Sequence, residues 1–520
     1  MSSNAASLSN ICSTFGSITQ ETFSGDMPSP RISELLRSND VPSDSELSNF
    51  RVIIKQGPRR IADLDQKIAR TKTFLNALCN ERDLVEANIM DAKVLSSPIR
   101  RLPAHILRSI AFETIPSPSE IMSSTSFCRY DSLDTQRSLW KLSQVSRSWR
   151  LTIVGSLELW STISLHIRLR HNDLVTAIGR PIFILGLHLE RSRNAPLTIS
   201  ISSSSSDVDH PFLSLISSRA SSIKNLYFSS NSLSAIRGLT CSRGSWNMLY
   251  HLKIRASGGR HVRESYDMFQ YAPNLRVCEV WVQKWEEIPL IPWVQLTNLM
   301  LRLHNKQHFE LLRQAKNITS LEVEETGSMM PEECEAISLP FLTSLTLRTQ
   351  SATISSLFIP NLTVLSLIYY GRPVFPRLTI SNTITTLKIT RIDEYCRGSG
   401  PEEICTFPGL PLLLESVPYI RRLVIESCNP LSLTDVTALT PTPTCTPIPR
   451  LQILDLRDCT LGFDHSRFVD MVAIHRLGDK SGIDRLETIH LNAPLELVGV
   501  CERTWQSLCH KGLIIKYGRS

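Results

Sequence analysis

LTSLTL at residues 342–347 and LTVLSL at residues 362–367 are the two stretches of this chain that decide its fold. Each places apolar residues at its first, fourth and sixth positions, with one polar residue between the last two. Because successive side chains of a strand point to opposite faces, the fourth and sixth residues share a face. Each stretch therefore predicts a short strand with one apolar face, and the 20 residues between Leu345 and Leu365 predict a repeat.

The same pattern occurs eleven times between residues 223 and 491. Seven of the ten intervals between central residues are 20–26 residues long, which is typical of leucine-rich repeats, and the other three are 31–36. No unit can cover its own apolar face, so neighbouring units must stack and bury a continuous core. The sequence predicts an α/β fold with a curved parallel sheet, extended by atypical strands at 162–165, 197–201 and 512–515. The central residues are Leu226, Leu252, Cys278, Leu299, Leu321, Leu345, Leu365, Leu387, Leu423, Leu454 and Ile489.

Residues 99–163, which precede the repeats, predict two short amphipathic helices. In the first, Pro103 suits the first helical position, and the apolar residues around it recur at helical spacing. The second has the same spacing of three and four residues, and Leu159-Trp160 follows it. Two helices this short cannot bury both apolar faces alone, so we expect them to dock on something. The apolar residues are Leu102, Ile106, Leu107 and Ile110 in the first helix, and Leu142, Val145 and Trp149 in the second.

These residues resemble an F-box, and the chain as a whole resembles fungal F-box-like proteins with C-terminal leucine-rich repeats. The resemblance implies a substrate receptor of an SCF-type cullin ubiquitin ligase, in which the box binds the S-phase kinase-associated adaptor. Two features depart from the family pattern: Ser146 stands where Cys is usual, and residues 113–138 separate the helices by more than a compact box needs. The expected adaptor-binding residues are Leu102, Pro103, Ile106, Leu107, Ile110, Leu142, Val145 and Trp149.

The N-terminal part predicts two further segments. Residues 1–58 are expected to be disordered, since 13 of the first 49 residues are Ser. Residues 59–97 predict a heptad-type helix that ends before Pro98, with apolar residues at eight of ten positions spaced by three and four. Its apolar stripe can pair with a second chain or pack on the helices that follow. An F-box-like domain at 98–165 and a leucine-rich-repeat solenoid at 166–520 complete the predicted organisation.

The polar positions between the inward apolar residues of the repeats predict the surface that faces a partner. Six of these residues are basic and five are acidic, and the two signs are interleaved along the arc. A nucleic-acid surface needs one sign, because phosphate neutralisation supplies most of the affinity. Trp and Arg are favoured anchors of protein interfaces. We therefore expect an unknown protein target to bind at Trp281, Arg302 and Arg348.

Composition predicts an intracellular protein, cytoplasmic or nuclear. The first residues lack a secretory signal, no apolar run is long enough to cross a bilayer, and the 13 Cys residues show no pair spacing, so we expect reduced thiols. The net charge of +7 is small for 520 residues. No motif predicts catalysis, a metal or a cofactor, so we expect no enzyme. The alternative function is a leucine-rich-repeat interaction scaffold outside any ubiquitin ligase.

Overall fold

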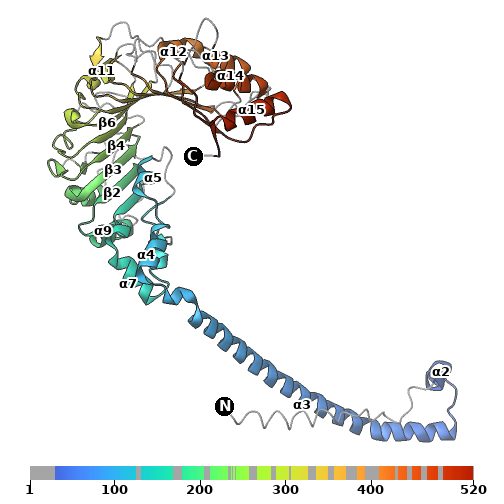
Figure 1. Cartoon of the computed structure of the whole chain (residues 1–520). Helices are drawn as coiled ribbons and strands as arrows, with labels where there is room; N and C mark the ends of the chain where they lie inside the picture. The colour runs from blue at the N-terminus through green and yellow to red at the C-terminus, as the bar shows by residue number, and fades with distance from the viewer. Residues whose placement is uncertain are drawn as a thin grey trace. The chain divides into compact units, whose positions relative to one another are not determined.

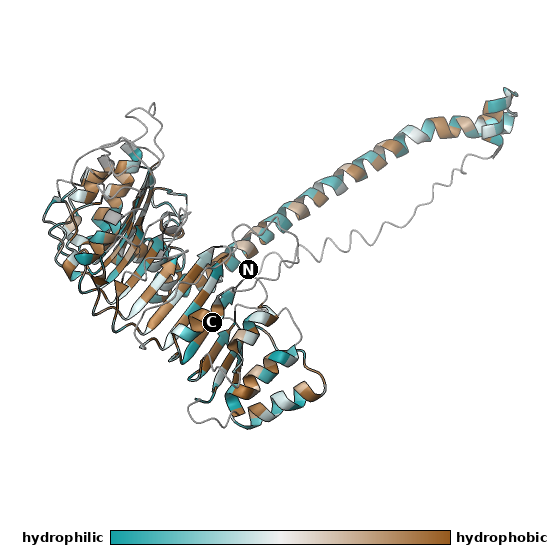
Figure 2. Ribbon diagram, turned by 90° about the horizontal axis from the view of Figure 1, so that it is seen from above, coloured by the Kyte–Doolittle hydropathy of each residue, from teal (hydrophilic) through white to brown (hydrophobic). Residues whose placement is uncertain are grey.

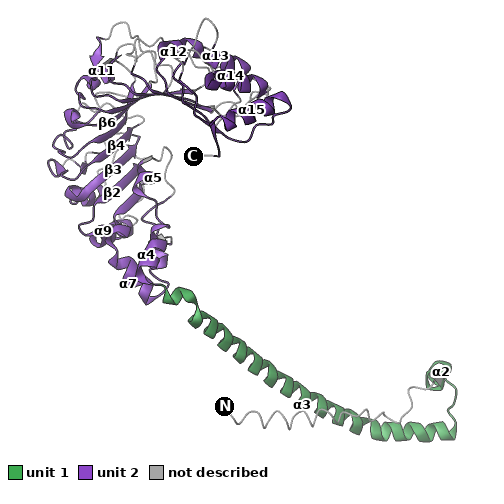
Figure 3. Cartoon of the chain, viewed as in Figure 1, with its two compact units in different colours: residues 1–102 green, residues 103–520 purple. Residues whose placement is uncertain are grey.

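The chain has an α/β fold, with a long N-terminal helix and a large parallel sheet of 14 strands. It divides into two compact units, residues 1–102 and residues 103–520 (Figure 3). The computed structural model describes residues 30–123, 130–136, 138–167, 179–203, 211–231, 236, 238–239, 242–256, 266–282, 288–303, 306–325, 335–348, 357–370, 383–392, 409–427, 431–441, 448–457, 465–477 and 484–518.

The first unit contains helices α2 (Pro30–Ser38) and α3 (Asp44–Ser96). Helix α3 begins 15 residues before the predicted start at residue 59, inside the segment expected to be disordered. A capping box explains this start, since the Ser43 hydroxyl accepts from the Glu46 N–H while the Glu46 carboxylate accepts from the Ser43 N–H. The expectation of disorder was therefore wrong for residues 30–38 and 44–58, and residues 1–29 lie outside the described part.

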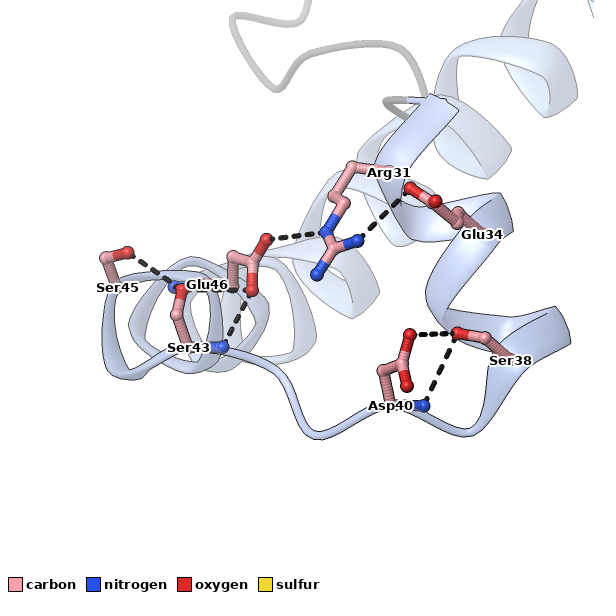
Figure 4. A network of polar contacts seen from close by, with 7 residues as sticks. All are labelled: Arg31, Glu34, Ser38, Asp40, Ser43, Ser45 and Glu46. Carbon is pink, nitrogen blue, oxygen red and sulfur yellow. Dashed lines mark hydrogen bonds and ion pairs between the residues drawn. The ribbon is translucent and has the colours of Figure 1, made fainter.

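Arg31 connects α2 to the start of α3 (Figure 4). Its guanidinium contacts the Glu34 carboxylate at 3.1 Å and the Glu46 carboxylate at 3.4 Å. The hydrogen bond from the Ser43 N–H is the largest influence on Glu46 and lowers the pKa of its carboxyl, and the Ser43 hydroxyl lowers it further. The same carboxylate thus caps α3 and anchors α2.

Helix α3 continues through Pro58 and ends at Ser96, before Pro98 as the sequence predicts, and the 3₁₀ turn η1 (Pro98–Arg101) follows Ser97. A residue before proline normally avoids the helical region because its Cβ and N–H crowd the ring, and Gly57 has no Cβ. Apolar residues occur along the whole helix (Figure 2). Among the described residues, none of those in α3 is buried.

The second unit begins with five short helices, which we call the helical group. They are α4 (Ala104–Phe112), α5 (Pro118–Ser123), α6 (Ser138–Leu142), α7 (Arg147–Gly155) and α8 (Leu157–Trp160). Pro103 is the residue before α4 rather than its first helical residue, one position off the prediction. The helical group and the sheet belong to one compact unit, so no unit boundary separates the predicted F-box-like segment from the repeats.

Each of the eleven predicted repeat units supplies one strand of the large sheet. The atypical strands at both ends were also predicted, and all neighbours in the sheet are parallel. The sheet is not closed on itself. Its strands are β1 (Thr162–Ile167), β2 (Leu197–Ser203), β3 (Ile223–Ser230), β4 (His251–Ala256), β5 (Val277–Val282), β6 (Asn298–Leu303), β7 (Ser320–Glu325), β9 (Ser344–Arg348), β11 (Val364–Tyr370), β12 (Thr386–Ile392), β13 (Arg422–Ser427), β14 (Ile453–Leu456), β15 (Thr488–Leu491) and β16 (Ile514–Tyr517).

The central apolar residues of the repeats form one continuous column across the sheet. Leu345 pairs with Leu321 on one side and Leu365 on the other, and the column continues in the same register from Ile163 to Ile515. The residues of the column from Ile163 to Ile489 are buried. Because a shift by one residue would turn every side chain to the other face, this column fixes the register of the sheet.

Helices lie on the outer side of the sheet and cover its apolar face (Figure 1). The three long intervals between repeats contain α12, α13 and α14 among their described residues. A two-stranded pair, β8 (Ile337–Ser338) with β10 (Leu357–Phe358), lies between shorter repeats. The helices are α9 (Gly179–Ser192), α10 (Pro211–Ser217), α11 (Lys306–Glu310), α12 (Leu410–Ser416), α13 (Leu433–Leu439), α14 (His465–Leu477) and α15 (Val500–His510).

Candidate functional site

The helical group is held together by α4 and α7, which pack against each other. Ser146 precedes α7, and its hydroxyl accepts from the Trp149 N–H at 3.3 Å, which fixes where α7 begins. Trp149 and Ile153 of α7 are buried, as are Leu107 and Ala111 of α4. The helical spacing seen in the sequence therefore marks the inner faces of these two helices.

The structure divides the eight predicted adaptor-binding residues into two sets. Leu107 is 1% exposed and Trp149 is 4% exposed, so these two side chains stabilise the helical group and can affect an adaptor only through its packing. Ile106, Ile110 and Val145 are 38%, 37% and 57% exposed and remain available for contact. The other three residues have intermediate or exposed side chains: Leu102, Pro103 and Leu142.

Two further apolar side chains of the helical group are exposed, Phe112 at the end of α4 and Leu151 in α7. Sequence reasoning missed both, because neither belongs to the apolar spacing that it followed. A signal was present only for Phe112, which directly follows the buried Ala111, whereas Leu151 lies two residues from both Trp149 and Ile153. We name Ile106, Ile110, Phe112, Val145 and Leu151 the exposed apolar residues of the helical group.

An aromatic cluster joins the helical group to the sheet layer, and sequence reasoning did not find it. The rings of Trp140, Trp160 and His188 meet edge to face, with centroids 4.9–5.7 Å apart. The Arg191 guanidinium lies 4.4 Å from the Trp160 ring centroid and 4.8 Å from that of Trp140. The Trp160 indole N–H also donates to the Ile153 carbonyl at 2.8 Å. Trp140 comes from α6, Trp160 from α8, and His188 from α9, the helix between β1 and β2. The cluster therefore fixes the helical group on the first strands of the sheet, which we call the first repeat.

His188 is neutral in this cluster. The pKa of its imidazole is lowered from 6.5 to about 4, mainly by burial and also by the Arg191 charge, against a smaller raising effect of the hydrogen bond to the Ser132 carbonyl. Its Nε2 lies 3.1 Å from the Ser132 carbonyl, which can only accept, so Nε2 carries the proton.

The burial of His188 predicts a loss of stability in mild acid. Between about pH 6.5 and pH 4 the unfolded chain binds a proton at this imidazole and the folded chain does not, so stability falls as the pH falls. The difference amounts to about 3 kcal/mol over that window. Urea unfolding at pH 7 and pH 5 measures about 2 kcal/mol of it. His188→Gln should reduce this pH dependence, whereas the exposed His105→Gln should not. An unchanged pH dependence in His188→Gln would contradict the assignment.

The face of the sheet opposite the outer helices, which we call the open face, carries two rows of side chains. Each strand of the sheet from β4 to β13 contributes one residue to each row, and β14 contributes one to the first, so residues far apart in sequence lie side by side. The first row is Lys253, Glu279, Met300, Glu322, Thr346, Ser366, Lys388, Val424 and Asp455. The second is Arg255, Trp281, Arg302, Glu324, Arg348, Ile368, Thr390 and Glu426.

The structure brings two of the three predicted target-binding residues together. The half-buried Trp281 ring lies between two guanidinium groups, 5.4 Å from that of Arg255 and 5.6 Å from that of Arg302. Arg302 also forms an ion pair with Glu324 at 2.8 Å. Arg348 stands two strands beyond Arg302 in the same row and pairs with Glu322. The predicted anchors thus share one surface, but their charges are already paired.

Helix α5, which belongs to the insertion at residues 113–138, packs on β2 and β3. Its residues Ile121 and Met122 are buried. The Lys253 ammonium, 7% exposed, donates to the Met122 carbonyl at 2.5 Å and contacts the Glu279 carboxylate at 2.9 Å. The described part of the insertion is therefore part of the fold, and it covers the beginning of the open face.

Near the other end, the open face has a depression of about 490 Å³ between β9 and β14. At its base the Asp455 carboxylate contacts Arg457 at 2.8 Å and Arg422 at 3.2 Å, and Lys388 contacts Glu426 at 2.7 Å. Burial tends to raise the pKa of Asp455, but hydrogen bonds from Arg457 outweigh it and lower that pKa overall. Sequence reasoning missed Arg422. In any unit the residue directly before the central apolar residue points to the opposite face of the strand, which is the open face.

Within the described ranges, no group of three His, Cys, Asp or Glu side chains is placed to hold a metal ion. No helix of the described part is long and apolar enough to cross a membrane. Comparison with protein families and with curated proteins finds no match for this chain.

Proposed function

We propose that this protein is the substrate receptor of an SCF-type cullin ubiquitin ligase. The helical group acts as an F-box that binds the S-phase kinase-associated adaptor, and the open face of the sheet binds a protein target. The observation that carries the proposal is that Ile106, Ile110 and Val145, three of the residues expected to contact the adaptor, are exposed on a helical group joined to a repeat sheet in one unit.

The sheet is, on this proposal, a leucine-rich-repeat solenoid. Supporting this are seven repeat lengths of 20–26 residues, a continuous column of paired central residues and helices on the outer side. In such an array each repeat contacts its neighbours, so the assembly is stable although no single unit is. The long final repeats, with α12, α13 and α14, extend the same arrangement.

The chain's contribution to the reaction is proximity. A conjugating enzyme carried by the ligase supplies the chemistry, while this chain holds a lysine of the target near the activated ubiquitin. Holding two reactants in a productive geometry converts a bimolecular step into an effectively unimolecular one. No side chain of this chain then needs to act as an acid, a base or a nucleophile.

A protein target suits the open face better than a nucleic acid does. Acidic and basic side chains are interspersed along both rows, and Glu279, Glu322, Glu324 and Asp455 pair with cations of the same face. A phosphate backbone would meet these carboxylates as well as the arginines. The Arg255–Trp281–Arg302 stack instead offers a large, ordered anchor of the kind that dominates protein interfaces.

We expect Trp281→Ala with Arg302→Ala to lose the target and keep the adaptor. Truncating central Trp and Arg anchors commonly costs ~2 kcal/mol or more, which is about a thirtyfold loss of affinity. The target is first identified by trapping ubiquitinated proteins, and its affinity for both chains is then measured. Lys388→Ala, at the other end of the rows, is the matched control. Unchanged target binding by the double variant would move the site elsewhere on the unit.

A scaffold outside any ligase is the second candidate, and the burial of Leu107 and Trp149 favours it, since two expected adaptor contacts face inward. Co-purification of the full-length chain with the adaptor distinguishes the two functions. A ligase receptor retains the adaptor and, through it, the cullin. A chain that retains neither, under conditions in which a known F-box protein retains both, would be a scaffold.

A further inference from the structure

Helix α3 presents a long apolar stripe that the described part of the chain leaves uncovered. Its 53 residues include none that is buried, and Ile61 and Leu75 are 61% and 57% exposed. The stripe continues with the same alternation of three and four residues into the part of α3 before residue 59. The stripe consists of Leu47, Phe50, Ile54, Gly57, Ile61, Leu64, Ile68, Thr71, Leu75, Leu78, Arg82, Val85, Ile89 and Ala92.

We propose that α3 pairs with α3 of a second copy of this chain as an antiparallel two-stranded coiled coil. In the register that we infer, Ile61 faces Leu78 of the second copy, Leu64 faces Leu75, and Ile68 faces Thr71. The outer layers then pair Ile54 with Val85, Phe50 with Ile89, and Leu47 with Ala92. A heptad stripe of this length is the standard interface of such coils.

Arg82 selects the antiparallel direction. In a parallel pair in register each stripe residue faces its own copy, so two Arg82 guanidinium groups would meet inside the interface. In the antiparallel register Arg82 faces Gly57 of the second copy, which has no side chain. A Cβ at position 57 would meet nothing within 4 Å in its own chain, so that side of α3 has space for the arginine.

The charges beside the stripe favour the same direction. In the antiparallel register Arg60 approaches Glu81 of the second copy, and the pair occurs twice by symmetry. A parallel pair would place Lys67 beside Lys72, and Glu81 beside Glu86. Ile and Leu at alternate stripe positions favour two-stranded coils that are parallel too, so this pattern does not distinguish the two directions. The direction therefore rests on Arg82 and the flanking charges.

The mass of the full-length chain in solution tests the pairing. Light scattering or sedimentation should give twice 58.6 kDa for the wild type. Leu64→Asp with Leu75→Asp places carboxylates in two facing layers and should give the single mass. The matched control, Leu84→Asp with Met90→Asp, adds the same charge at exposed apolar residues outside the stripe and should remain dimeric. A wild-type chain that stays monomeric at micromolar concentration overturns the proposal.

Disulfide formation tests the direction, in full-length chains that carry Cys79→Ser. One chain carries Ile61→Cys and another carries Leu78→Cys. Under mild oxidation a covalent dimer should form in the mixture, at least tenfold above either variant alone and above a chain carrying only Cys79→Ser. Cross-linking of each variant with itself, and none added by mixing, would show a parallel pair and overturn the inferred register. Neither experiment requires the ubiquitin ligase, so the inference stands independently of the proposed function.

Discussion

A chain with Ile106→Asp and Ile110→Asp is expected to lose the adaptor in a pull-down. Both residues lie on the exposed side of α4, one turn apart, and each is more than one-third exposed. Burying an apolar side chain of this size contributes ~1.5–3 kcal/mol, so losing two lowers the affinity by at least about a hundredfold. Calorimetric titration of the purified chain with the adaptor measures the change.

Three variants make this result specific. Val145→Asp changes the most exposed of the three predicted contacts that remain on the surface, and should weaken binding without disturbing α4. Leu102→Ala with Pro103→Ala tests the start of the pattern and should also abolish measurable binding. Leu433→Asp adds a charge at an exposed apolar residue of α13 and should bind normally. Normal adaptor binding by the Ile106, Ile110 double variant would remove the basis for an F-box role of the helical group.

Trp160→Ala should be the most destabilising single truncation around the helical group. Trp160 is fully buried, its ring contacts Trp140 and His188, and its indole N–H bonds the Ile153 carbonyl. Truncating a buried aromatic side chain to alanine costs ~3–5 kcal/mol. Because the cluster joins the helical group to the first repeat, we expect that end of the unit to unfold first, which hydrogen exchange would detect.

Trp281→Ala is the matched comparison for Trp160→Ala. It removes the same side chain from the open face, where the ring is half-buried between two arginines. We expect it to cost clearly less than Trp160→Ala in urea unfolding. Equal losses for the two variants would contradict the view that the cluster is part of the core and that Trp281 belongs to a surface.

The sequence predicted the strands of the sheet well, because a strand with one apolar face leaves a local signal. The sixth residue of each unit shares a face with the fourth, and this alternation placed all eleven strands. The same reasoning identified the residues of the open face, since a residue between two side chains of the buried apolar face must point to the opposite face. The irregular spacing predicted some helix in the connections between strands but not where it lies, although α12 contains three leucines in succession from Leu412 to Leu414.

Contacts between distant segments were beyond the sequence. Nothing near Met122 indicates that its carbonyl accepts from Lys253, 131 residues later. The pairing of charges is equally non-local, since Arg422 and Asp455 come from neighbouring strands. Helix spacing located the apolar residues of the helical group correctly but did not separate Leu107, which is buried, from Ile106, which is not. Local patterns show which residues are apolar, and only the packing shows which of them remain outside.

The alternation of the strands separates what holds the sheet together from what the sheet displays, and this bears on how such a surface can diverge. The central column faces the outer helices, whereas the rows face the other way, one residue per strand. A change at Met300 or Thr346 therefore alters one place on the open face without reaching the column. Surface changes of this kind usually alter stability by no more than about 0.5 kcal/mol. Descendants of this chain can acquire new specificity strand by strand, with Lys253, Glu324, Ser366 and Asp455 as the costly exceptions because all four are buried.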